Sequence, residues 1–137
     1  MQEEKICKFQ SFASIGSPEL GPERLAALQN EITKRGLDGF LIPRSDAYRG
    51  EYVAEKDQRL RWLTGFEGSA GICVLVKQRI GIFVDGRYTQ QAKNQAGKYF
   101  RIIDIGKGLP HKYIKRKIKI GYNPLLFTNR SLNFYFK

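Results

Sequence analysis

Two short apolar runs constrain the fold of this chain more than any other feature. Ile72–Val76 and Ile80–Val84 are continuously apolar, which is typical of strands whose two faces are both covered by other parts of a protein. Only Lys77 and Gln78 separate them, so the runs predict a tight hairpin, although this pair lacks the usual turn residues. We therefore interpret the chain as a scaffold packed around this hairpin, with its functional groups at the two ends.

A glycine-rich loop precedes the hairpin. Gly65, Gly68 and Gly71, with Ser69 and Ala70 between them, leave this loop almost free of side-chain bulk, and glycine permits the close approach of another backbone. The spacing is superficially that of a nucleotide-binding loop, but such a loop follows a strand and opens a helix. This one follows a helical segment and opens a strand, so we predict a packing turn.

The best-defined helix is predicted at residues 22–35. Pro22 suits the first helical position, apolar residues recur at i, i+3 and i+7, and Gly36 ends the pattern. A buried strand is predicted at 40–42, stopped by Pro43. The further predicted elements are a short helix that Asp57 caps and that runs to Leu63, a helix at 87–95 that Asp85 caps, a buried strand at 100–105, an exposed strand at 117–122 and a final helix at 125–137.

The chain has the length of one domain and carries its charge unevenly. It has 137 residues and a formal net charge of +11. Up to Gly86, 12 basic residues balance 12 acidic ones, whereas the remainder has 12 basic residues and one acid, Asp104. This basic block is a candidate surface for nucleic acid or another acidic partner, a solvated face, or a face that meets a neighbouring domain. Residues 1–19 are aperiodic and predict a flexible leader before a domain at 20–137.

Composition also indicates the cellular compartment of the protein. No apolar run approaches the ~20 residues of a membrane span, and the N-terminus lacks the apolar region of a signal peptide, so we expect no membrane association. The two cysteines, Cys7 and Cys73, form no disulfide framework, which favours a cytoplasmic location. We expect Cys73 to be a small buried hydrophobe.

The chain contains no recognisable catalytic or metal-binding set. His111 is the only histidine, and no glutamate follows Glu67, whereas a hydrolytic metal site needs several converging His and carboxylate ligands. His111 also has no evident serine or cysteine partner with which to form a triad. We therefore expect no catalytic residue, no metal ligand and no cofactor in this chain.

Arg87 is the main binding candidate. It follows a strand end and a flexible glycine, so its guanidinium can project from the rim of the sheet and bind a carboxylate or carbonyl group. The alternative is a surface arginine paired with Asp85 or Glu67. Trp62, the only tryptophan, belongs to a residue type found more often in a core than on a binding platform. Further candidates for the rim of the site or for an interface are Arg44, Asp46, Trp62 and Phe66.

Five segments, in this order and at similar spacing, resemble one known family. They are Asp38-Gly-Phe-Leu-Ile-Pro-Arg-Ser-Asp46, Glu51-Tyr-Val53, Arg59-Leu-Arg-Trp-Leu-Thr-Gly-Phe-Glu-Gly-Ser-Ala-Gly71, Asp85-Gly-Arg-Tyr88 and Ile120-Gly-Tyr-Asn-Pro124. Over residues 20–130 the chain resembles the N-terminal, creatinase/prolidase-type domain of Xaa-Pro aminopeptidase (aminopeptidase P) in its longer multidomain form. The resemblance implies an α/β fold with a mixed β-sheet flanked by helices.

The resemblance also implies an activity for the whole family protein. Family members are cytosolic or otherwise soluble metallopeptidases that remove an N-terminal residue preceding proline. A separate pita-bread catalytic domain in them binds two manganese or zinc ions. The arginine of the Asp-Gly-Arg-Tyr motif contributes to the peptide-binding site, and it corresponds to Arg87. The family's metal ligands, two aspartates, a histidine and two glutamates, have no counterpart here, and Asn123 stands where an aspartate is common.

The leading hypothesis is therefore a C-terminally incomplete, non-catalytic N-terminal domain of an Xaa-Pro aminopeptidase. Such a domain shapes the peptide-binding mouth and supports homo-oligomerisation, and it meets a peptide substrate only beside a catalytic domain. The alternative is a basic nucleic-acid-binding module that uses the Arg87–Lys137 face, which charge alone supports. A small carboxylate-assisted nuclease has the least support of the three.

Overall fold

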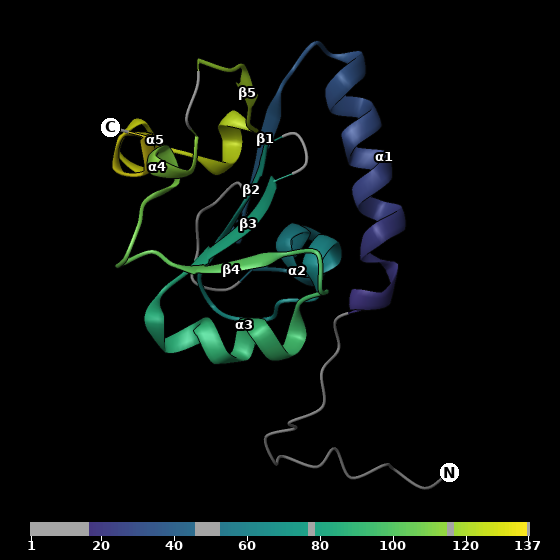
Figure 1. Cartoon of the computed structure of the whole chain (residues 1–137), viewed down its shortest axis with the longest axis vertical. Coiled ribbons are helices and arrows are strands. Elements are labelled where there is room, and N and C mark those ends of the chain that lie inside the picture. The colour runs from purple at the N-terminus through teal and green to yellow at the C-terminus, as the bar shows by residue number, and fades with distance from the viewer. Residues whose placement is uncertain (1–16, 46–52, 77–78, 115–116, 137) are drawn as a thin grey trace, which may run out of the picture.

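The computed structural model describes residues 17–45, 53–76, 79–114 and 117–136. These residues form a five-stranded sheet with helices on both faces (Figure 1). The α-helices are α1 (Gly21–Lys34), α2 (Arg59–Thr64), α3 (Thr89–Gln95), α4 (Pro110–Tyr113) and α5 (Asn129–Phe136). The strands are β1 (Gly39–Pro43), β2 (Ile72–Val76), β3 (Arg79–Val84), β4 (Arg101–Asp104) and β5 (Ile120–Gly121). Short 3-10 turns are η1 (Pro18–Leu20), η2 (Glu55–Asp57), η3 (Gly86–Tyr88) and η4 (Pro124–Leu126). Most of the predicted leader lies outside the described residues.

The sheet is mixed, with strand order β4-β3-β2-β1-β5. β2 pairs antiparallel with β1 and β3, whereas β3–β4 and β1–β5 are parallel pairs. The expected α/β class, a mixed β-sheet flanked by helices, is thereby confirmed. The hairpin is confirmed as well, because β2 and β3 pair from Ile72 opposite Phe83 to Val76 opposite Arg79. The two residues that link them lie outside the described residues.

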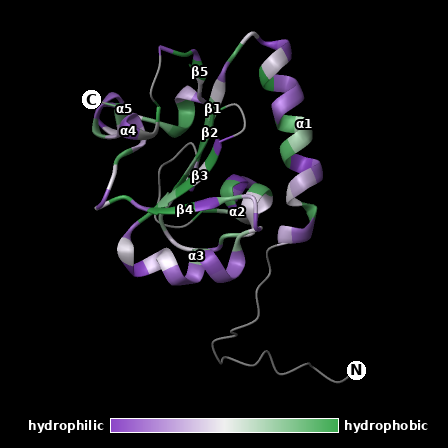
Figure 2. Cartoon of the chain, in the orientation of Figure 1, coloured by the Kyte–Doolittle hydropathy of each residue, from purple (hydrophilic) through white to green (hydrophobic). Residues whose placement is uncertain are grey.

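Alternate side chains of β2 enter two separate apolar layers. Cys73 and Leu75 belong to the layer that α1, α2 and α3 cover, whereas Ile72 and Val74 belong to the layer that η4 and α5 cover. Figure 2 shows the hydrophobic strands between helices that also carry hydrophilic residues. Both faces of β2 are therefore covered, which is why its apolar run is continuous rather than alternating.

α1 confirms the helix predicted at 22–35 to within one residue, the usual uncertainty of a helix boundary. Pro22 lies in its first turn, and Leu25 and Ile32 are buried against the sheet. Gly36 then takes φ +67°, a conformation that glycine adopts readily after a helix end. α1 thus covers one face of the sheet and leads directly into β1.

Several predicted elements differ from the structure. Asp57 belongs to the preceding turn η2, and Gln58 holds the N-cap position of α2 without a side-chain hydrogen bond to the helix. The strand predicted at 117–122 is reduced to Ile120–Gly121, because β5 meets β1 over only two residues. β4 lies at the edge of the sheet and its side chains are partly exposed, so the expectation of a buried strand is wrong there.

The predicted final helix is interrupted. Pro124–Leu126 forms a 3-10 turn, which Asn123 caps by accepting a hydrogen bond from a backbone N–H of the turn. Phe127 is extended, with φ −127° and ψ 148°. Thr128 then caps α5 by accepting a hydrogen bond from Ser131 N at 3.0 Å. The two caps divide the segment, so Phe127 enters the core between two separate turns of helix.

Candidate functional site

One end of the sheet gathers most of the predicted site residues. Pro43 pairs with Ile72, and Val84 pairs with Asp104, so the carboxyl ends of β1, β3 and β4 lie beside the start of β2. Loops at the carboxyl ends of strands are where open α/β sheets place functional groups. We call this surface the carboxyl edge; it consists of Arg44, the loop 65–71 and residues 85–88.

Asp85 anchors the turn that follows β3. Its Oδ1 accepts a hydrogen bond from the backbone N of Arg87 at 2.9 Å and another from Arg87 Nε at 3.0 Å. Both hydrogen bonds hold the pKa of Asp85 below its usual value. The bond from the backbone N–H has the larger effect, and the bond from the guanidinium has the next largest. The same contact raises the pKa of Arg87. Both groups are therefore charged at neutral pH, and the predicted capping role of Asp85 is confirmed for the turn η3 that opens α3.

The guanidinium of Arg87 is held on one side and open on the other. Its bond to Asp85 uses Nε, its carbon lies 5.6 Å from the ring centroid of Tyr88, and 79% of the side chain is exposed. Within the described part of the chain, no hydrogen bond occupies Nη1 or Nη2 of this residue. Arg87 can therefore pair with Asp85 through Nε and at the same time present Nη1 and Nη2 to a ligand.

Tyr88 joins this turn to the glycine-rich loop, a role that the sequence alone did not indicate. Its hydroxyl is hydrogen-bonded to the hydroxyl of Ser69, and its ring meets Phe66 edge to face with centroids 6.5 Å apart. Arg44 reaches the same loop from β1 and donates from Nη1 to Ser69 O at 2.8 Å. The sequence feature that could have indicated this role is the position of Tyr88 as the last residue of the Asp-Gly-Arg-Tyr motif.

The glycine-rich loop is held by close packing. Gly65 has φ +86°, and a Cβ there would lie 2.7 Å from the backbone oxygen of Gln95. A Cβ on Gly68 would overlap the ring of Phe66. Gln95 also fastens the loop to α3, since its Oε1 accepts from Glu67 N at 3.0 Å and its Nε2 donates to the Glu67 carboxylate at 3.1 Å. These contacts are those of the packing turn predicted for this loop.

The other candidates are placed differently. Phe66 lies in the glycine-rich loop and contacts Tyr88, but it is only 1% exposed, so its side chain supports the carboxyl edge from the core. Trp62 is 53% exposed, and the expectation of a core tryptophan is wrong, because α2 turns Leu60, Leu63 and Thr64 inward and leaves Trp62 on the outer side. Asp46 lies outside the described residues.

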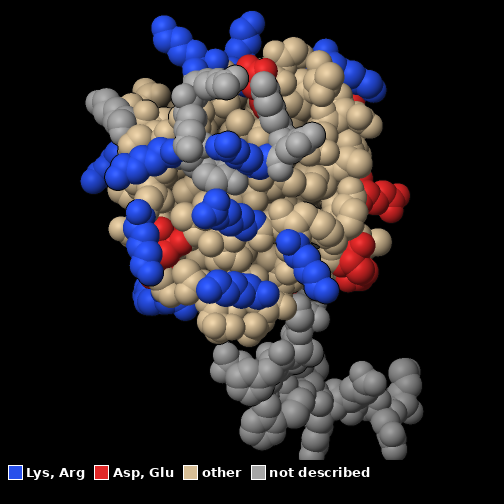
Figure 3. Space-filling model, in the orientation of Figure 1, with Lys and Arg blue, Asp and Glu red and all other residues tan. Residues whose placement is uncertain are grey.

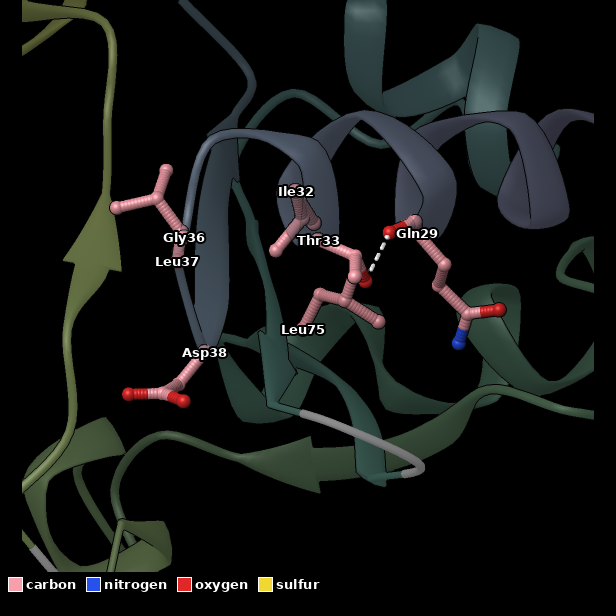
Figure 4. A pocket seen from close by; sticks show the side chains of 7 residues that line it. All are labelled: Gln29, Ile32, Thr33, Gly36, Leu37, Asp38 and Leu75. Atoms are coloured by element: carbon pink, nitrogen blue, oxygen red, sulfur yellow. Dashed lines mark hydrogen bonds between the residues drawn. The ribbon is translucent and has the colours of Figure 1, made fainter.

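A separate pocket of about 530 Å³ lies at the opposite end of the sheet, between the end of α1 and the start of β1 (Figure 4). It is lined by Gln29, Ile32, Thr33, Gly36, Leu37, Asp38 and Leu75. Its size suits a small ligand. Asp38, however, accepts a hydrogen bond from Lys119 N at 2.8 Å, and in Figure 4 its carboxylate points away from Thr33 and Leu75. The lining therefore brings no set of charged groups together.

Within the described ranges, no three His, Cys, Asp or Glu side chains gather where they could hold a metal ion. These residues do not fit the two-metal centre that the resemblance implies for whole family proteins. Burial raises the pKa of Cys73 to about 12, so its thiol is neutral and suits neither metal binding nor nucleophilic attack. Among the helices of the described segments, none combines the length and the apolar character that crossing a membrane requires.

The model of the creatinase/prolidase N-terminal domain family matches residues 24–132. The chain belongs to this family. Xaa-Pro aminopeptidase 2 of Sus scrofa is 32% identical over 117 residues, which cover 82% of this chain and 17% of that protein. A probable Xaa-Pro aminopeptidase P of Coprinopsis cinerea is 32% identical over 115 residues, which cover 77% of this chain and 18% of that protein. The expected family is confirmed, and the chain spans less than a fifth of the length of these two relatives.

Solved structures agree with this family in fold. The X-prolyl aminopeptidase of Caenorhabditis elegans, described as a cytosolic enzyme with a di-nuclear active site, has a TM-score of 0.62 at 29% identity, covering 73% of this chain and 18% of that one. The Xaa-Pro dipeptidase of Bacillus anthracis has a TM-score of 0.63 at 26% identity, and the match covers 84% of this chain and 30% of that one. The N-terminal domain of the cytoplasmic peptidase PepQ of Mycobacterium tuberculosis H37Rv has a TM-score of 0.61 at 26% identity, and the match covers 81% of this chain and 80% of that one. The chain therefore shares the fold of the N-terminal domain of the PepQ peptidase.

Proposed function

We propose that this chain serves as the non-catalytic N-terminal domain of an Xaa-Pro aminopeptidase and that Arg87 helps to bind the peptide. The observation that carries the proposal is the guanidinium of Arg87, which Asp85 holds through Nε at the carboxyl edge while 79% of the side chain stays exposed. The matched relatives are named as Xaa-Pro aminopeptidases. We place the domain at residues 20–137 behind a leader at 1–19. A cytoplasmic location is supported by the cysteine usage and by the cytosolic relative.

The proposed role follows from the chemistry of a guanidinium. Its planar N–H donors bind carboxylates and carbonyl oxygens in a fixed geometry. Because Asp85 already restrains Arg87 through Nε, less side-chain freedom is lost when a ligand binds. Nη1 and Nη2 then donate to a backbone carbonyl or to the terminal carboxylate of a peptide that a neighbouring catalytic domain holds.

The test places this domain beside a working catalytic domain. Residues 24–132 replace the matched region of the Sus scrofa relative, and hydrolysis of an Xaa-Pro peptide is measured. We expect Arg87→Gln to raise KM about 10- to 100-fold, the effect of losing a charged hydrogen bond, with a smaller change in kcat. Arg101→Gln, which alters an exposed arginine on β4, serves as the matched control. Equal KM values for the unsubstituted hybrid and the Arg87→Gln variant contradict the binding role.

The non-catalytic part of the proposal has its own test. The purified 137-residue chain is incubated with an Xaa-Pro peptide and added manganese, and free N-terminal residue is quantified. We expect none above the level of a mock purification, because the described residues offer no group of metal ligands. Release that grows in proportion to the amount of chain shows that it is catalytic and overturns this part.

We further propose that the domain supports self-association. Large apolar side chains are exposed on two parts of the chain, Leu20, Trp62 and Tyr99 around the start of α1, and Tyr122, Leu125 and Phe134 in the segment from the end of β5 to α5. Exposed apolar groups that cluster on a soluble protein commonly mark interfaces. Sedimentation velocity measures the mass of the chain in solution, and a monomer at all concentrations up to about 200 μM contradicts self-association.

A further inference from the structure

Tyr88 follows Arg87 directly, and its side chain is held at both ends. The ring is half-buried, packs against the apolar layer that α1, α2 and α3 cover, and meets Phe66 edge to face. The hydroxyl is hydrogen-bonded to the hydroxyl of Ser69, an exposed residue of the loop 65–71. Tyr88 therefore connects the turn η3, which carries Arg87, to a loop that lies 19 residues earlier in the chain.

The loop that contains Ser69 is itself anchored. Arg44 Nη1 donates to Ser69 O at 2.8 Å, and Arg44 N donates to Gly71 O at 2.9 Å, so the residue after β1 bonds the loop at two positions. The hydrogen bonds of Gln95 fasten the same loop to α3. The bond between the two hydroxyls therefore restrains Tyr88, because the loop on the other side of that bond is attached to β1 and to α3.

Tyr88 restrains Arg87 through its backbone and through its ring. Tyr88 N donates to Asp85 O at 2.8 Å, which closes the turn η3. The guanidinium carbon lies 5.6 Å from the centroid of the Tyr88 ring, a distance at which a cation is attracted to an aromatic face. Asp85 meets the same guanidinium at Nε, at 3.0 Å. A carboxylate and a ring therefore restrain a side chain that is 79% exposed.

We propose that Tyr88 is a positioning residue for Arg87 and that its bond to Ser69 keeps the guanidinium in the orientation that binds the peptide. This inference rests on the proposed function and deepens it, since it names the residues that set the direction of Arg87. The peptide contacts Arg87, whereas Tyr88 and Ser69 act through it. Without the bond between the hydroxyls, the ring tilts on the core and the guanidinium loses the surface beside it. Peptide binding then carries the added cost of ordering Arg87.

The hybrid peptidase that carries residues 24–132 provides the first test. Tyr88→Phe and Ser69→Ala each remove one hydroxyl and keep the ring and the turn. We expect either change to raise KM about 3- to 10-fold, the effect of one neutral hydrogen bond, with a smaller change in kcat. Ser69→Thr retains a hydroxyl and keeps the KM of the unsubstituted hybrid. Thr33→Val is the matched control and leaves KM unchanged, because it removes an exposed hydroxyl that bonds Gln29 O at the opposite end of the sheet.

Combined variants separate positioning from a direct role. Because Tyr88 acts through Arg87, we expect Tyr88→Phe to change KM no further once Arg87→Gln is present. Tyr88→Phe together with Ser69→Ala raises KM no more than either change alone, because both remove the same bond. An additional effect of Tyr88→Phe in the Arg87→Gln background overturns the positioning role, since the hydroxyl then acts on the peptide or on the fold.

The second test needs no peptidase activity. ¹⁵N relaxation of the Arg87 Nε–H group, measured by NMR on the whole 137-residue chain, reports the mobility of the guanidinium on the ps–ns timescale. We expect Tyr88→Phe and Ser69→Ala to lower its order parameter and Thr33→Val to leave it unchanged, and far-UV circular dichroism shows that each variant is folded. An unchanged order parameter in Tyr88→Phe overturns the inference, whatever the KM values are.

The two tests distinguish this inference from the proposed function. If Arg87→Gln leaves the KM of the hybrid unaltered while the order parameter of Arg87 Nε falls in Tyr88→Phe, the binding role of Arg87 fails and its restraint by Tyr88 stands. If Arg87→Gln raises KM while Tyr88→Phe changes neither KM nor the order parameter, the binding role stands and the positioning role of Tyr88 fails.

Discussion

At the residue scale, one carboxylate oxygen decides how Arg87 is presented. Asp85 Oδ1 accepts from both the backbone N and Nε of Arg87, so the same atom sets the path of the chain and the direction of the guanidinium. Aspartate favours such local bonds at turns. Lysine at position 87 would keep the charge and lose Nε, so the two basic residues are not interchangeable at this position.

We expect Arg87→Met to raise the pKa of Asp85 only part of the way back to its ordinary value of 3.8. The larger cause of the lowering is the backbone N–H of residue 87, which the variant keeps, whereas the guanidinium is lost. Because the folded pKa is depressed, the stability that Asp85 contributes is present above pH 3.8 and is lost as the pH falls through the folded pKa. Carboxyl chemical shifts followed by NMR measure the pKa in both proteins. A return to the full ordinary value contradicts the dominant role of the backbone bond.

At the element scale, two glycines with positive φ do different work. Gly36 follows α1 with φ +67°, and a Cβ added there would meet no atom of the described residues within 4 Å. Gly65 follows α2 with φ +86° and lies against Gln95 and Pro18. Gly36 is therefore required for backbone conformation alone. Gly65 is required both for conformation and for the approach of α2, η1 and α3 that supports the glycine-rich loop.

We expect Gly65→Ala to destabilise the domain more than Gly36→Ala. The left-handed conformation costs alanine about 1 kcal/mol at either position, and overpacking against Gln95 adds ~1–3 kcal/mol at Gly65 alone. Urea unfolding of the two variants measures the difference directly, with Gly36→Ala as the matched control. Equal losses of unfolding free energy in the two variants would show that the residues around Gly65 shift to accommodate the added methyl group at no cost in free energy.

At the scale of the whole molecule, positive charge is concentrated in one part of the chain. The 12 basic residues and one acid that follow Gly86 account for the net charge of +11. Figure 3 shows Lys and Arg side chains spread over the face on which β4 and α3 lie, with few acidic groups among them. Charge remains the only support for the nucleic-acid alternative, and the matched relatives are peptidases.

We expect the chain to bind duplex DNA only weakly and without sequence preference. Attraction of this kind depends on counterion release, so it falls steeply between about 50 and 200 mM salt. Fluorescence anisotropy with two unrelated labelled duplexes measures it, and we expect equal affinities at low salt and no binding at about 0.2 M. Sequence-dependent binding that persists at this salt and disappears when Lys112, Lys117 and Lys119 become glutamine would restore the alternative.

Short-range patterns were sufficient for the helix that covers the sheet, for the central hairpin and for one half of the site. The helix at 22–35 and the β2–β3 hairpin depend on spacing, caps and glycines that act over a few residues. Arg87 and Asp85 lie two residues apart, so their pairing could be anticipated from the sequence. The exposed strand at 117–122 could not be predicted correctly, because its alternation describes a strand only where a partner pairs with it, and β1 pairs with two of its residues.

Contacts between distant segments account for what the sequence left open. Tyr88 meets Ser69 across 19 residues, and Arg44 meets the same serine across 25; no local pattern specifies either bond. Trp62 belongs to a residue type that is common in cores, yet it lies at the surface. Only one side of α2 packs against the domain, and Leu60, Leu63 and Thr64 occupy that side. Residue types and their spacing therefore determined the first helix, the central hairpin and the family. Burial and the grouping of side chains at the carboxyl edge arose from packing, which joins parts of the chain that are far apart in the sequence.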